Sequence, residues 1–99
     1  MADANYEWLE SNGFEKPADG FRNWQSERCE KRINIWLDGD TGYWCCDLTM
    51  RMDELDAFCY IKYRYGDTAE DACKGARKRM HEYLGKQRIR LMNEKEGEI

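Results

Sequence analysis

Two alternating apolar segments on either side of one turn constrain the fold of this chain more than any other feature. Residues 31–38 carry Ile, Ile and Leu at every second position, and residues 43–50 alternate in the same way. Between them, residues 39–42 (Gly-Asp-Thr-Gly) have the composition of a tight turn. A period of two places the apolar side chains on one face of a strand. The two segments are therefore predicted to form a β-hairpin.

A third strand and a long helix are predicted to follow the hairpin. Residues 57–65 are rich in Tyr, Phe and Ile and end at a Gly-Asp pair, which is typical of a strand followed by a turn. Thr68 with Asp71 three positions later resembles a capping box, and apolar residues then recur at helical spacing. The pattern predicts a helix over residues 68–84 that could extend to residue 93.

The first 30 residues carry weaker signals. Asp3 is predicted to cap a short helix over residues 3–12. Residues 13–30 are interpreted as an ordered loop, in which a short strand near residues 21–25 stays open. Together the elements predict a single α+β domain over residues 1–99, in the order αβββα. Its three-stranded antiparallel sheet would carry the N- and C-terminal helices on one face.

The composition limits what kind of protein this is. The 99 residues allow one hydrophobic core, and thirteen aromatic residues stand against eleven Leu and Ile and no Val. This aromatic content excludes a disordered chain. No apolar run is long enough to span a membrane, and the N-terminus lacks the pattern of a signal peptide. We expect a cytoplasmic protein that does not bind membranes.

The cysteines and the single histidine do not predict a metal or catalytic site. Five cysteines are an odd number, none forms a Cys-x-x-Cys pair, and His81 has no His or Cys at helical spacing. Buried free thiols in a reducing compartment are the expected state of these cysteines. The chain also lacks a nucleophile elbow and a phosphate-binding glycine loop. We therefore expect no enzymatic activity and no cofactor.

The predicted sheet leaves one face without a helix to cover it, and that face is unusually aromatic. Antiparallel sheets with one covered face commonly present polar residues on the other. Here the aromatic residues of the loop, Phe14, Phe21 and Trp24, could fold over it, or it could be open to a partner. Trp, Tyr, Phe and Arg dominate protein interfaces. The candidate partner-binding residues are Trp36, Tyr43, Phe58, Tyr60, Lys62 and Arg64.

The leading hypothesis is a protein-interaction module that uses this face and an acidic rim near the first helix. The alternative is a single- or double-stranded nucleic-acid-binding domain. From Lys74 to Arg90 there are seven basic residues and one acidic residue, although the whole chain has a net charge of −4. The candidate nucleic-acid-binding residues share one side of the predicted helix: Lys74, Arg77, Lys78 and Arg88. A homodimer through Ile89, Leu91 and Met92, or through the open sheet, is also considered.

Residues 63–76 (Tyr-Arg-Tyr-Gly-Asp-Thr-Ala-Glu-Asp-Ala-Cys-Lys-Gly-Ala) resemble the junction between last strand and last helix in the double-stranded-RNA-binding domain, whose topology is similar. In that family a Lys-Lys-x-Ala-Lys start to the helix contacts phosphates. This chain keeps Ala72, but Glu70 and Asp71 replace the paired lysines and Cys73 replaces the third. The resemblance implies the topology and not the RNA-binding site.

Residues 43–47 (Tyr-Trp-Cys-Cys-Asp) and 60–67, within a small acidic chain rich in Trp and Tyr, resemble segments of bacteriophage accessory proteins, among them the anti-CRISPR proteins. That resemblance implies an inhibitor that occludes a protein or nucleic-acid-binding surface of a host complex, such as a defence ribonucleoprotein. It would then act in the cytoplasm of the host cell.

Overall fold

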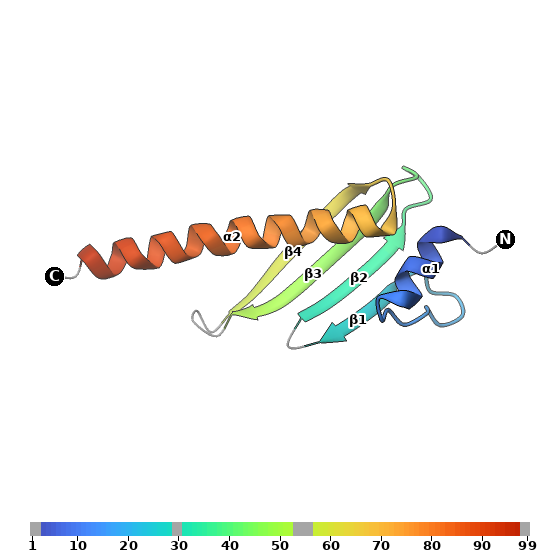
Figure 1. Cartoon of the computed structure of the whole chain (residues 1–99), viewed down its shortest axis with the longest axis horizontal. Helices are drawn as coiled ribbons and strands as arrows, with labels where there is room; N and C mark the ends of the chain where they lie inside the picture. Colours follow the sequence, from blue (N-terminus) through green and yellow to red (C-terminus); the bar gives the residue numbers. More distant parts are fainter. Residues whose placement is uncertain (1–2, 29–30, 53–56, 98–99) are drawn as a thin grey trace.

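The computed structural model describes residues 3–28, 31–52 and 57–97. It has one antiparallel sheet in the order β1-β2-β3-β4, with a short helix before it and a long helix after it (Figure 1). The elements are α1 (Ala4–Ser11), β1 (Trp24–Arg28), β2 (Lys31–Leu37), β3 (Trp44–Met52), β4 (Ala57–Gly66) and α2 (Ala69–Gly97).

The predicted α+β architecture is confirmed, but the prediction of three strands was wrong. Residues 24–28, which lie in the segment interpreted as a loop with a short strand near residues 21–25 left open, form the edge strand β1 and pair with β2. Trp24 is opposite Ile35 and Ser26 is opposite Ile33, so both lie on the helix-facing side of the sheet. Only Trp24 supplies a large apolar side chain to that face, which is why residues 24–28 show little apolar alternation.

The core lies between the sheet and the two helices. α2 crosses one face of the sheet (Figure 1), and its first two turns present the small buried residues Ala69, Ala72 and Ala76. Small side chains let a helix approach the pleated surface closely. α1 packs on the same side through Leu9, which is fully buried, and through Tyr6, whose ring contacts two sheet tryptophans.

Local signals in the sequence fix the start of each helix. The Asp3 carboxylate accepts a hydrogen bond from the backbone N–H of Asn5 at 2.8 Å, and the Thr68 hydroxyl accepts one from the N–H of Asp71 at 3.1 Å. Both caps were predicted. The side-chain oxygen of Asn5 also accepts from the backbone N–H of Ala69 at 2.8 Å. This bond joins the beginnings of the two helices.

α2 is longer than the sheet that supports it. Leu84 is the last of its described side chains to pack against the core, and the helix then continues past the end of the sheet (Figure 1). The molecule is accordingly elongated, with extents of 63 × 23 × 21 Å. Among the described residues, no helix combines the length and the apolar character needed to cross a bilayer.

Candidate functional site

The strand register sets which side chains occupy the sheet face opposite the helices, here called the outer face. Trp36 of β2 is opposite Cys45 of β3, and Asp47 of β3 is opposite Lys62 of β4. Thr49 is opposite Tyr60 one step further along. Because side chains alternate between faces, all of these residues point away from α1 and α2.

Four outer-face residues form a group held by hydrogen bonds and one cation–π contact, here called the Asp47 cluster: Trp36, Asp47, Tyr60 and Arg64. The two carboxylate oxygens of Asp47 accept from different donors, the Arg64 guanidinium at 2.7 Å and the Tyr60 hydroxyl at 2.6 Å. The guanidinium also lies 4.8 Å from the centre of the Trp36 ring. Each polar group therefore restricts the rotamer of its neighbour before any partner arrives.

The electrostatics of the cluster follow from that geometry. The hydrogen bond to Asp47 raises the pKa of the Tyr60 hydroxyl, because the protonated phenol is the donor. For Arg64, burial works to lower the pKa, but the hydrogen bond and charge of Asp47 outweigh it and the pKa is raised. Arg64 thus stays charged and Tyr60 stays neutral throughout the physiological range.

Two further predicted residues flank the cluster on β4. The ammonium of Lys62 lies 5.3 Å from the centre of the Tyr60 ring, within the range of a cation–π contact. Phe58 is 72% exposed and stands opposite Arg51 near the start of the strand. The structure therefore brings five of the six predicted partner-binding residues onto the outer face.

Tyr43, the sixth, is separated from this group. Its ring contacts Tyr65 edge-to-face with 5.9 Å between ring centres, and Tyr65 in turn contacts Tyr63, which faces the helices. Tyr43 lies just before β3, and the strand pairing beside it is irregular: Trp44 pairs with Gly66 but Cys46 pairs with Tyr63, so the extra residue lies in β4, next to Tyr65. Such a bulge redirects side chains locally, and alternation along the sequence does not reveal it.

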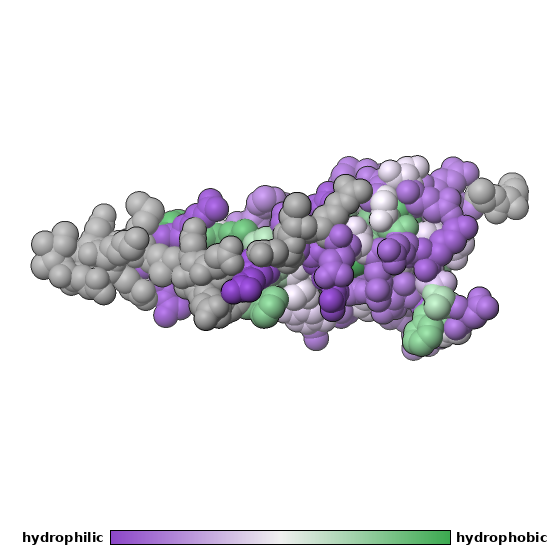
Figure 2. Space-filling model, turned by 90° about the horizontal axis from the view of Figure 1, so that it is seen from below, coloured by the Kyte–Doolittle hydropathy of each residue, from purple (hydrophilic) through white to green (hydrophobic). Residues whose placement is uncertain are grey.

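The aromatic residues of the loop do not lie over the outer face. Phe14 and Trp24 are buried in the core on the helix side, while Phe21 is 74% exposed and lines a groove beside α1. Figure 2 shows a mostly hydrophilic surface with apolar residues in small, separate groups. The described residues in that view therefore form no extended aliphatic patch.

The outer face is more positive than the chain as a whole. Among the described residues, its basic members outnumber its acidic ones by four to two: Arg32, Arg51, Lys62 and Arg64 against Glu27 and Asp47. Both acids have a partner on the same face, because Glu27 lies 3.5 Å from Arg32 and Asp47 binds Arg64.

The four candidate nucleic-acid-binding residues lie on a different surface. Lys74, Arg77, Lys78 and Arg88 are all exposed on α2, which lies on the helix side of the sheet. Lys74 pairs with Glu70 one turn earlier at 3.1 Å, so its charge is partly neutralised. The basic side of the helix and the aromatic face of the sheet therefore do not form one continuous site.

The thiols of the described cysteines are buried. Cys45, although it lies on the strand position that faces outward, is only 1% exposed. Burial raises the pKa of the thiols of Cys45, Cys46, Cys59 and Cys73. Within the described part of the chain, no group of three His, Cys, Asp or Glu side chains could hold a metal ion.

Comparison with known proteins assigns no family or fold to this chain. The chain matches no protein-family model, no curated protein and no solved structure.

Sequence reasoning missed one surface and leaves one prediction open. A groove between α1 and residues 16–22 was not predicted, because its walls come together only once Trp24 joins the sheet. Of the residues considered for a homodimer, Ile89 is 61% exposed on the protruding part of α2. The side chains of Leu91 and Met92 lie outside the described residues.

Proposed function

We propose that this protein is a non-enzymatic interaction module that binds another protein through the outer face of its sheet. The observation that carries the proposal is the Asp47 cluster, in which hydrogen bonds fix a Tyr and an Arg, and the Arg guanidinium lies against a Trp ring, on an uncovered face. These are the residue types that most often dominate interface energies. Side chains that are already ordered lose little conformational entropy when they bind.

The cluster supports a protein partner better than a single-stranded nucleic acid. Base stacking needs free aromatic faces beside unpaired cations. Here the Arg64 guanidinium occupies one side of Trp36, and Asp47 neutralises its charge. Lys62 also lies against the Tyr60 ring. A protein surface that offers apolar groups and hydrogen-bond acceptors fits this arrangement.

In line with the resemblance to phage accessory proteins, we propose that the partner is a host complex whose surface the module covers. The simplest test compares Trp36→Ala and Tyr60→Ala with Tyr83→Ala, a control that removes an exposed aromatic side chain from α2. Tagged proteins are used to capture partners from host lysate, with and without nuclease. Capture should be lost with the outer-face variants, survive nuclease and persist with Tyr83→Ala. Unchanged capture by folded Trp36→Ala and Tyr60→Ala would contradict the proposal.

The second candidate function is nucleic-acid binding by α2, which the exposed row of Lys74, Arg77, Lys78 and Arg88 favours. Phosphate contacts are strongest at low salt. Fluorescence anisotropy with a labelled RNA and a labelled DNA at about 50 mM salt therefore tests it. Binding that weakens in a Lys74→Ala/Lys78→Ala variant supports this function, and no affinity for either probe removes it.

A further inference from the structure

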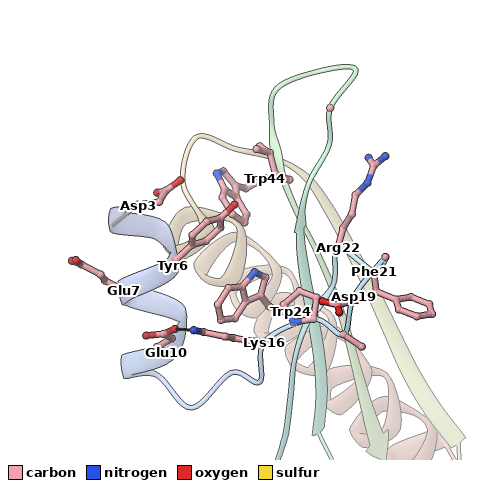
Figure 3. A pocket seen from close by; sticks show the side chains of 15 residues that line it. Asp3, Tyr6, Glu7, Glu10, Lys16, Asp19, Phe21, Arg22, Trp24 and Trp44 are labelled. Carbon is pink, nitrogen blue, oxygen red and sulfur yellow. Dashed lines mark ion pairs between the residues drawn. The ribbon is translucent and has the colours of Figure 1, made fainter. Parts of the chain in front are cut away.

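A groove on the helix side of the molecule forms a second candidate surface, here called the α1 groove. It lies between α1, the loop of residues 16–22 and the turn after β2, and its volume is about 820 Å³ (Figure 3). Tyr6, Trp24 and Trp44 form its floor, and Glu7, Asp19 and Phe21 stand on its walls.

The floor of the α1 groove carries aromatic rings with unused hydrogen-bond donors. Tyr6 stacks on Trp24 with 5.5 Å between ring centres and meets Trp44 edge-to-face at 6.4 Å. Trp24 is only 6% exposed and Trp44 only 4%. Within the described chain, neither indole N–H has a hydrogen-bond partner. Among the described residues, every side-chain nitrogen that is fully shielded from water has a hydrogen-bond partner. The two unpartnered indole N–H groups must therefore be accessible to water. Figure 3 shows the two indole nitrogens beside the Tyr6 ring.

The walls of the α1 groove are acidic. Its lining includes four acidic residues and two basic ones: Asp3, Glu7, Glu10 and Asp19 against Lys16 and Arg22. Glu10 is paired with Lys16 at 2.9 Å. In the described structure Glu7 and Asp19 have no ion-pair partner, and Figure 3 shows the Glu7 side chain pointing outward from α1, so its carboxylate lies at the rim of the groove. A basic segment that lies in the groove would therefore meet aromatic rings on the floor and unpaired carboxylates at the edges.

We propose that the α1 groove binds a basic, arginine-containing segment of a partner protein. One guanidinium can lie against the half-exposed ring of Tyr6, and basic groups of the same segment can pair with the carboxylates of Asp19 and Glu7 at the edges of the groove. Backbone carbonyls of the same segment can accept hydrogen bonds from the indole N–H groups of Trp24 and Trp44. A simple cation has no hydrogen-bond acceptor, so the groove suits a peptide better. Phe21, whose exposed ring points outward from the opposite wall, can contact the aliphatic parts of the segment where it leaves the groove. This site is distinct from the outer face, so each can fail without the other.

The first test measures binding of a fluorescein-labelled Gly-Arg-Gly-Arg-Gly peptide by anisotropy at about 50 mM salt, where charge pairing is least screened. Glu7→Gln should weaken binding about threefold to fivefold, the effect of losing a partly exposed ion pair. The matched control Glu82→Gln makes the same charge change on α2 and should leave binding unchanged. The same peptide with citrulline in place of arginine should bind more weakly. Equal effects of Glu7→Gln and Glu82→Gln would show attraction by net charge alone and overturn the proposal.

The second test locates the peptide. The chain has four tryptophans, so a ¹H–¹⁵N spectrum contains four indole N–H signals, which Trp→Phe variants assign. The peptide should shift the signals of Trp24 and Trp44 and leave that of Trp36, on the outer face, in place. Shifts of Trp36 alone, or of no indole signal, would place the peptide elsewhere and refute the α1 groove as its site. Phe21→Ala, which changes an exposed side chain, should weaken binding without unfolding the protein.

Discussion

Gly75 provides a direct test of how closely α2 approaches the sheet. A Cβ atom at this position would lie 2.6 Å from two carbons of the Tyr63 ring. The ring has little freedom to move, because Arg79 lies 4.9 Å from its centre on α2 and Tyr65 meets it edge-to-face. Gly75→Ala therefore forces either the ring or the helix to shift. Gly85 lies in the same helix with nothing within 4 Å of its Cβ position, and it is the matched control.

Two opposing effects set the expected magnitude. Alanine is favoured over glycine inside a helix by about 1 kcal/mol. Overpacking a filled site costs about 1–3 kcal/mol. Gly75→Ala should therefore lower the free energy of unfolding by about 1 kcal/mol, or Tm by roughly 4–8 °C for a domain of this size. Gly85→Ala, which has only the favourable effect, should raise the free energy of unfolding by up to about 1 kcal/mol.

Urea denaturation of the two variants, followed by circular dichroism, measures both values. A double-mutant cycle with Tyr63→Leu identifies the cause, because removing the ring should make Gly75→Ala stabilising. If Gly75→Ala stabilises the protein as much as Gly85→Ala does, then α2 does not pack on Tyr63 as described and the argument fails.

Three further predictions follow from the core, the outer face and the thiols. Leu9→Ala empties a fully buried position and should lower the free energy of unfolding by about 2–5 kcal/mol in urea denaturation; a near-zero change would mean that α1 is not docked. Asp47→Asn should lower the pKa of Tyr60 towards its ordinary value of about 10 in an ultraviolet titration. A raised tyrosine pKa favours folding only while the phenol is protonated. The stability advantage of the wild type over Tyr60→Phe should therefore be complete below about pH 10 and shrink as the pH rises through the folded-state pKa; a constant difference would refute the hydrogen bond. In a Cys29→Ser background, the native protein should react with Ellman's reagent at pH 8 far more slowly than the unfolded protein, because burial raises the thiol pKa of Cys45, Cys46, Cys59 and Cys73.

The parts of the fold that the sequence predicts are those with a regular period or a local cap. The hairpin of β2 and β3 follows from strict alternation, and both helix starts follow from side chains that bind backbone N–H groups a few residues away. The sequence leaves β1 open as a short strand near residues 21–25 and does not assign it to the sheet, because its hydrogen bonds and its one apolar contact depend on a strand that comes later in the chain. Tertiary pairing, and not local propensity, makes residues 24–28 a strand.

The same distinction applies to the candidate site. Alternation alone placed Trp36, Phe58, Tyr60, Lys62 and Arg64 on the outer face, and the strand register agrees. It could not predict the contact of Tyr43 with Tyr65, because the bulge in β4 between Tyr63 and Gly66 breaks the period there. Nor could it reveal the α1 groove, whose floor joins residues from α1, β1 and β3 that are distant in sequence.

The arrangement of the two surfaces bears on how a partner could be held. The outer face and the α1 groove lie on opposite sides of the same sheet, and Trp24 pairs in register with Ile35, the immediate neighbour of Trp36. The outer face is net positive, whereas the α1 groove is net negative. A partner surface that fits the outer face therefore needs net negative charge, and one that fits the α1 groove needs net positive charge. A uniformly charged partner would bind only one of the two surfaces. Salt should weaken both contacts, but lowering the negative charge through Glu7→Gln should weaken only the α1 groove, which separates the two by electrostatics alone.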